Sequence, residues 1–159
     1  MQIQNSPTQH HQVRRKWKWI GIVLFVSYFA VLIYSTLLTF NYYVYGKSFN
    51  LVLFDSIELM WESGNPWLMF KNIIGNILLF MPLGFLLPLI WRPLSRLKFM
   101  FWISFGTSTA IEYSQFMYAN RIFDIDDILL NGVGGLIGVL FFKICAFMYR
   151  IYERNVKKR

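Results

Sequence analysis

Amide and ionisable side chains occur within stretches of this sequence that are otherwise apolar, where a polar group is costly in lipid. Those whose spacing points to chemistry are Asn72, Asn76, Glu112, Gln115, Asp127 and Asn131. They form three pairs with members three or four residues apart, so each pair shares one face of a helix. A carboxylate in this setting can exchange a proton or balance a cation, and the amides can donate and accept hydrogen bonds.

Further charge lies in the short segment RIFDIDDI that follows Glu112. Arg121 is the nearest cation and the expected partner of Glu112. The oxygens of Asp124, Asp126 and Asp127 suit Mg²⁺ or Ca²⁺. Aspartates at the start of an apolar run also cap a helix by accepting its free N–H groups. We therefore predict no metal site and no cofactor.

The sequence lacks the common catalytic signatures. It contains no G-x-S-x-G, H-E-x-x-H, P-loop or dinucleotide-binding glycine pattern. Its only histidines, His10 and His11, lie in a polar N-terminal stretch, so a His-dependent hydrolase site at membrane depth is not expected. The pattern favours a non-enzymatic role and identifies no catalytic residue.

The elements that must position these residues are four apolar runs, at residues 19–45, 72–91, 97–118 and 128–149. A helix that crosses a bilayer needs about 20 such residues. Of the 159 residues, 56% are hydrophobic and 15% charged, more apolar than a small soluble domain can bury. The single cysteine, Cys145, excludes an intrachain disulfide. We predict an all-α integral membrane protein with four transmembrane helices.

The distribution of Lys and Arg predicts the orientation of these helices. Of the 16 basic residues, 13 lie in the two tails, at the end of the fourth run or in the loop between the second and third runs. By the positive-inside rule these regions are cytoplasmic, so both termini face inward. We expect a disordered basic tail at residues 1–18, a membrane domain at 19–149 and a basic tail at 150–159. Basic clusters beside membrane ends also argue against nucleic acid as a partner.

Two shorter patterns refine this arrangement. Between the first and second runs, Phe54, Ile57 and Trp61 recur at helical spacing, which predicts an amphipathic segment on the outer surface, followed by a turn at 64–66. In the fourth run, Gly134 and Gly138 form a G-x-x-x-G step that lets another helix approach closely. Gly135 lies beside that step, and we expect its counterparts to be Gly75 and Gly84 in the second run.

In this arrangement Asn76, Glu112 and Asn131 reach similar depths, one to two helical turns below the outer surface. Three helices therefore direct polar groups to one layer. Each residue taken alone could serve as an interhelical hydrogen-bond partner. Their convergence favours a functional site in the outer leaflet.

The same residues carry a family resemblance. The segments NIIGNILLFMPLGFLLPL, IEYSQ and RIFDIDDILLNGVGGLIG, in this order, resemble the VanZ-like family of bacterial membrane proteins over residues 50–142. The positions marked by the resemblance are Asn72, Asn76, Glu112, Gln115, Arg121, Asp124, Asp127 and Asn131. One departure lies in the first outer loop, where the family often has N-L-x-P-F and this chain has Leu53 in place of the proline.

The resemblance implies a multi-pass protein of the bacterial cell membrane with a role at the cell envelope. The founding member of the family is associated with resistance to the glycopeptide teicoplanin. Our first hypothesis is a cell-envelope protein that reduces susceptibility to such lipoglycopeptides through an outer-leaflet polar pocket. A second is an intramembrane transferase or hydrolase acting on a lipid or lipid-linked precursor, and a third is a small transporter or assembly partner. The expected partners are membrane lipids, a lipid-linked cell-wall precursor or lipoglycopeptide, and a second copy of the chain.

Overall fold

The computed structural model describes residues 7–38 and 48–156, and the side chains of residues 16–37 and 48–156. In chain order the elements are α1 (Pro7–Ile33), a π-helical turn (Tyr34–Leu38), β1 (Phe49–Asn50), α2 (Asp55–Glu62), α3 (Pro66–Ile90), a 3₁₀ turn (Arg92–Ser95), α4 (Leu97–Tyr118), β2 (Phe123–Asp124) and α5 (Ile125–Val156). Apart from the two-residue strands, the described fold is therefore helical, as predicted.

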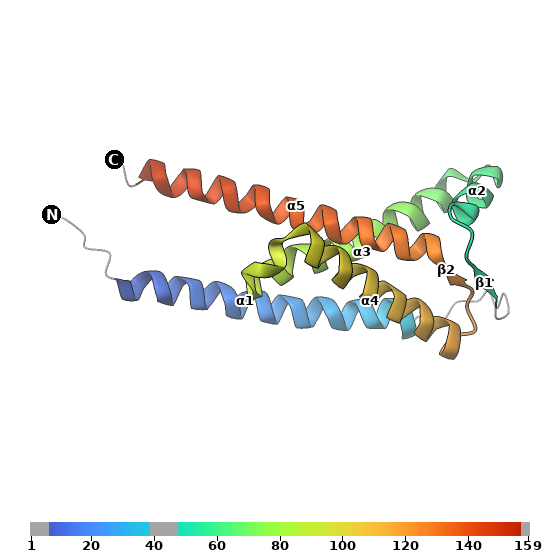
Figure 1. Cartoon of the computed structure of the whole chain (residues 1–159), viewed down its shortest axis with the longest axis horizontal. Helices are drawn as coiled ribbons and strands as arrows, with labels where there is room; N and C mark the ends of the chain where they lie inside the picture. Colours follow the sequence, from blue (N-terminus) through green and yellow to red (C-terminus); the bar gives the residue numbers. More distant parts are fainter. Residues whose placement is uncertain (1–6, 39–47, 157–159) are drawn as a thin grey trace.

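Figure 1 shows an elongated bundle whose four long helices run back and forth along its length. Helix α1 runs from the end that holds both termini to the opposite end. The chain then returns through α3, runs out again through α4 and returns through α5. Both termini lie at one end, and α2, β1 and β2 lie at the other. We call these the terminal end and the α2 end.

Three described helical segments are long and apolar enough to cross a membrane, namely Lys16–Leu37, Pro66–Ile90 and Ile125–Val156. The chain is therefore a membrane protein. The remaining predicted span coincides with α4, whose bounds are Leu97 and Tyr118. This helix is less apolar because one of its faces carries Ser104, Ser108 and Glu112, all buried against neighbouring helices.

The ends of the outer helices differ from the predicted tails. We expected a disordered basic tail at residues 1–18, whereas α1 begins at Pro7 and includes residues 7–18. Nothing between Pro7 and the apolar run breaks a helix, and Pro itself is favoured at a first helical position. At the other terminus α5 continues through the basic tail to Val156. The end of the first predicted span, residues 39–45, lies outside the described residues.

The predicted amphipathic segment and turn both form between α1 and α3. Helix α2 has no buried residue, and Trp61 is 72% exposed. Gly64 then adopts a left-handed conformation, with φ +62°, that glycine accommodates without strain. The side chain of Asn65 accepts hydrogen bonds from Trp67 N at 3.1 Å and Leu68 N at 3.2 Å, which caps the start of α3.

Helices α3 and α5 form the most extensive helix–helix contact, followed by α4 with α5 and α1 with α3. A Cβ atom on Gly84 would lie 1.9 Å from the carbonyl oxygen of Gly135, and one on Gly134 would lie 2.2 Å from that of Ile77. Glycine is therefore required at these points for the backbones to approach. Gly75, expected to join this contact, is exposed with nothing within 4 Å of its Cβ position, so that part of the prediction is wrong.

Candidate functional site

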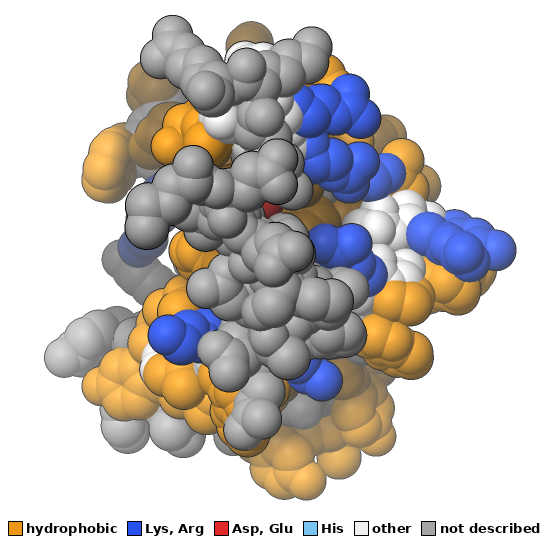
Figure 2. Space-filling model, turned by 90° about the vertical axis from the view of Figure 1, so that its left-hand side faces the viewer, with side chains coloured by type: hydrophobic (Ala, Val, Ile, Leu, Met, Phe, Trp, Pro, Cys, Tyr) orange, Lys and Arg blue, Asp and Glu red, His pale blue; other side chains and the backbone are white. Residues whose placement is uncertain are grey.

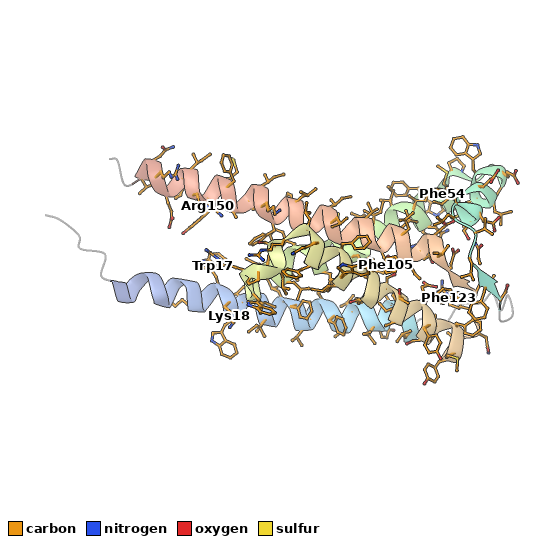
Figure 3. All side chains as sticks on the ribbon, viewed as in Figure 1. Trp17, Lys18, Phe54, Phe105, Phe123 and Arg150 are labelled. Carbon is orange, nitrogen blue, oxygen red and sulfur yellow. The ribbon has the colours of Figure 1, made fainter. Side chains whose placement is uncertain are left out.

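A short parallel bridge joins the loop after α1 to the loop before α5 at the α2 end. Phe49 pairs with Phe123 and Asn50 pairs with Asp124, and the Phe123 N–H donates to Ser48 O at 3.0 Å. The Phe49 ring packs between the rings of Phe116 and Phe123, with centroid distances of 4.4 and 5.8 Å. Figure 3 labels Phe54 and Phe123 at this end. The bridge brings the polar residues of the two loops together.

Asp126 is the most buried carboxylate of this cluster, with 1% of its surface exposed. One oxygen accepts a hydrogen bond from Phe54 N at 2.6 Å, and the other accepts from Ser56 N at 3.1 Å. These N–H groups belong to the start of α2, where a helix leaves its backbone donors unpaired and favours a negative charge. Asp126, at the start of α5, thus caps α2 from about 70 residues away along the chain.

Asp124 links the same loop to α4. One of its oxygens accepts from Asp126 N at 2.9 Å, and the other accepts a short hydrogen bond from the Ser56 hydroxyl. The Asn50 side chain donates to the Ser56 hydroxyl oxygen at 2.8 Å. The Asp124 N–H donates to the Glu112 carboxylate at 3.2 Å. Glu112 is 4% exposed. It is connected to the start of α2 through the hydrogen bonds of Asp124.

Asp127 connects α5 to α3. Its carboxylate accepts a hydrogen bond from the Asn76 side chain at 2.5 Å. Glu112 and Asp127 repel each other, and Arg121 attracts both. Arg121 therefore acts on the pair of carboxylates together, whereas we had expected it to serve Glu112 alone. Its own backbone N–H donates to Gln115 O at 3.4 Å.

One turn farther from the α2 end, the layer continues between α4 and α5. The Asn131 side chain donates to the Ser108 hydroxyl oxygen at 2.8 Å. Asn131 is 4% exposed and Ser108 is fully buried. The bond pairs the buried amide nitrogen with the buried hydroxyl, whereas the Asn131 side-chain oxygen has no hydrogen-bond partner among the described residues. This contact holds the polar faces of α4 and α5 in register.

The two remaining candidates make different contacts. The Gln115 side chain donates to Thr36 O at 2.8 Å, which ties α4 to the turn after α1. The Asn72 side chain donates to Leu68 O at 2.9 Å within its own helix. Asn72 therefore does not join the layer, although Asn76, one turn away, does. The polar layer is defined hereafter as Asn50, Ser56, Asn76, Ser108, Glu112, Arg121, Asp124, Asp126, Asp127 and Asn131.

Sequence reasoning missed part of this layer. Asn50 and Ser56 gave no signal, because their partner Asp124 is far away in sequence. Asp126 was considered as a metal ligand or a cap of its own helix, whereas it caps α2. Ser104 and Ser108 lie eight and four residues before Glu112, so a polar stripe along one face of α4 was available in the sequence to identify them.

The described residues hold no group of three or more His, Cys, Asp or Glu side chains arranged to hold a metal ion. The polar layer holds four carboxylates, Glu112, Asp124, Asp126 and Asp127, against the one guanidinium of Arg121, so its acidic groups outnumber its cations. A hollow of about 250 Å³ lies elsewhere, between α3 and α5, and its lining is apolar. Its lining residues are Met81, Pro82, Phe85, Leu86, Gly138 and Phe141.

Comparisons with known proteins fit this combination of apolar helices and buried polar groups. The model of the VanZ/LLP1 family matches residues 20–146. Protein VanZ from Enterococcus faecium is 34% identical over 107 residues, which cover 67% of this chain and 58% of that protein. The matched segment thus spans less than two thirds of that relative. No solved structure matches the chain.

Proposed function

The chain belongs to the VanZ/LLP1 family, and from this we propose that it is a bacterial cell-envelope protein that reduces susceptibility to teicoplanin-type lipoglycopeptides. The observation that carries the proposal is the assembly of the polar layer. Residues from the three segments that resemble the family meet there, at the end of the bundle away from both termini. Hydrogen bonds of Asn50 and Ser56 connect the first outer loop to these residues.

The proposal includes four spans with both termini in the cytoplasm. The described basic side chains of the terminal end are Lys16, Lys18, Arg92, Arg96, Lys98, Lys143, Arg150 and Arg154. Figure 2 looks onto this end and shows Lys and Arg side chains among hydrophobic ones. The positive-inside rule makes such an end cytoplasmic. With α4 as the fourth span, its buried serines and Glu112 face protein and avoid lipid.

In this orientation the polar layer lies near the outer surface and positions an exposed apolar platform. The platform consists of residues 51–54 together with Leu59 and Trp61, each more than half exposed. Asp126 and Asp124 fix the platform by capping α2 and binding Ser56. Because Asp124, Asp126 and Asp127 are bonded to the platform or to neighbouring helices, we propose that the layer acts through the platform.

An apolar platform at the outer surface explains a preference for lipoglycopeptides. Teicoplanin carries an acyl chain and therefore partitions to the membrane surface, where apolar and aromatic side chains can contact it. Vancomycin lacks that chain, and we expect it to be unaffected. The same contact could be made with the lipid part of a cell-wall precursor.

The test is the susceptibility of a sensitive Gram-positive host that expresses the full chain at matched membrane levels. We expect protection from teicoplanin but not from vancomycin. Glu112→Gln keeps a hydrogen-bond acceptor for Asp124 N but removes the charge, and we expect it to abolish protection. Asn76→Leu should do the same by unpairing Asp127. Asn72→Leu is the matched control, because Asn72 bonds only within its own helix.

Full protection by both Glu112→Gln and Asn76→Leu would exclude the polar layer from the activity. If the unaltered chain gives no protection, the resistance role is wrong, and the membrane lipids and precursors of the expressing cells should then be profiled.

A further inference from the structure

The terminal end carries two helical arms whose described side chains are mostly exposed. All five residues from Lys16 to Ile20 of α1 are exposed, which is more than one full turn. In α5, all residues from Phe147 to Tyr152 are exposed. Among the described residues, α1 and α5 share no extensive helix–helix contact. We define the arms as residues 16–20 and 143–156.

Figure 1 shows both arms continuing past the turn between α3 and α4, which ends short of them. At about 1.5 Å per residue, the 32 residues of α5 span about 48 Å, against about 30 Å of hydrocarbon. The excess length places the arms at the level of the lipid headgroups. Headgroups and the first methylenes of their chains therefore contact the exposed side chains of the arms and of the α3–α4 turn.

The side chains of the arms are suited to a negatively charged lipid. The arms, the α3–α4 turn and the first residues of α4 carry eight described Lys and Arg side chains and one carboxylate, Glu153. The apolar and aromatic residues between them include Trp17, Phe147 and Tyr152, which are 55%, 61% and 66% exposed. Figure 3 labels Trp17 and Lys18 on one arm and Arg150 on the other, at the same end of the molecule.

We propose that the two arms and the α3–α4 turn form a binding site for an anionic phospholipid. The basic residues bind its phosphate and charged headgroup, and the exposed aromatic and aliphatic residues contact the glycerol and upper acyl chains. Basic sites between the cytoplasmic ends of helices are suited to such headgroups. Because both arms contribute basic side chains, the bound lipid bridges α1 and α5. The site is independent of the polar layer and of any effect on antibiotics.

The experiment is native mass spectrometry of the full chain in a neutral detergent. The chain is titrated separately with phosphatidylglycerol, phosphatidylcholine and inorganic phosphate. We expect retention of phosphatidylglycerol, weakened by added salt, with little retention of phosphatidylcholine. Each basic residue near an anionic surface contributes about fivefold to affinity, so Arg150→Gln combined with Arg154→Gln should weaken binding about 25-fold. Lys16→Gln combined with Lys18→Gln should weaken it similarly, because both arms contribute.

Lys71→Gln is the matched control, since Lys71 is exposed at the α2 end and should not affect binding. None of the substituted side chains is buried, so the fold should persist. Equal retention of phosphatidylcholine, or equal weakening by Lys71→Gln, would overturn the proposal. Loss in only one of the two double variants would exclude a site between the arms. Saturation by inorganic phosphate at the same concentration would show an anion site without lipid.

Discussion

At the scale of single residues, Asp126 does the most to hold the α2 end together. Its two oxygens are the acceptors for Phe54 N and Ser56 N, and it is almost fully buried. Removing a buried acceptor leaves each donor with a cost of about 1–3 kcal/mol. Because neither N–H has another acceptor in its own helix, Asp126 controls whether the start of α2 stays docked on α5.

We therefore expect Asp126→Ala to release the start of α2 without unfolding the bundle. At about 1.4 kcal/mol per factor of ten, the amides of residues 54 and 56 should exchange with solvent about tenfold faster or more. The measurement is hydrogen exchange followed by mass spectrometry of the full chain. Asp126→Asn keeps one carbonyl oxygen and should show a smaller effect. Unchanged protection in Asp126→Ala would mean that these hydrogen bonds do not hold α2.

The contact between Asn131 and Ser108 is a second residue-scale test. Asn131→Leu and Ser108→Ala should each lower the free energy of unfolding by about 1–3 kcal/mol, since each leaves a buried group unpaired. The double variant should lose less than the sum, because the two losses share one interaction. Ser114→Ala, on a less buried part of α4, should stay within about 0.5 kcal/mol. Additive losses would show that the pair does not interact.

How far the sequence could predict the site depends on which contacts are local. Helical spacing predicted similar depths for Asn76, Glu112 and Asn131, because depth follows from counting residues along a helix; in the structure Asn76 bonds to Asp127, and Asn131 bonds to Ser108. The same spacing could not separate Asn76 from Asn72, since a shift of one turn leaves both on one face. The roles of Asn50, Ser56 and Asp126 depend on a loop-to-loop bridge across about 70 residues. No periodicity encodes such a contact.

At the scale of elements, the glycines decide how closely α3 and α5 approach. A Cβ on Gly84 would overlap the Gly135 carbonyl, and one on Gly138 would lie 2.1 Å from the Met81 oxygen. Backbone atoms cannot rotate away from a new methyl group, so the helices themselves must separate. A motif of glycines four residues apart therefore predicts that another helix packs closely, but it does not identify which helix that is.

Gly84→Ala should therefore destabilise the bundle by about 1–3 kcal/mol or more, as overpacking does. The measurement is the thermal melting temperature of the full chain in detergent. Gly75→Ala is the matched control on the same helix, where the new methyl group meets nothing. It should be neutral or stabilise by up to about 1 kcal/mol, because alanine favours a helix over glycine. Equal loss in both variants would indicate an effect of helix propensity and not of packing.

The ends of the helices were predictable where a helix-breaking residue or a turn marks them. Helix α4 begins and ends at the expected residues, because a proline-containing turn precedes it and Asn120, with φ 50°, follows it. Helix α2 and the turn before α3 were likewise signalled by Gly64, Asn65 and Pro66. The start of α1 was not, since charge alone does not stop a helix. Basic residues such as Lys and Arg are good helix formers.

At the scale of the whole molecule, charge separates along the bundle. Of the described carboxylates, only Glu153 lies at the terminal end, and the other seven lie at the α2 end or in the polar layer. In the proposed orientation, the polar layer and the platform lie on the outside, because the positive-inside rule assigns the basic end to the cytoplasm. The orientation depends on α4 crossing the membrane, because three spans would put the two termini on opposite sides.

Cysteine labelling tests that orientation. The only natural cysteine, Cys145, is exposed, so the background is Cys145→Ser. In it, Ser63→Cys at the α2 end should react with a membrane-impermeant maleimide in intact cells. Asn155→Cys at the end of α5 should react only after the cells are permeabilised, because four spans return the chain to the cytoplasm. Both positions are exposed, so a difference in labelling reports the side of the membrane. Labelling of Asn155→Cys in intact cells would mean that α4 does not cross the membrane. The proposed position of the polar layer near the outer surface would then be wrong.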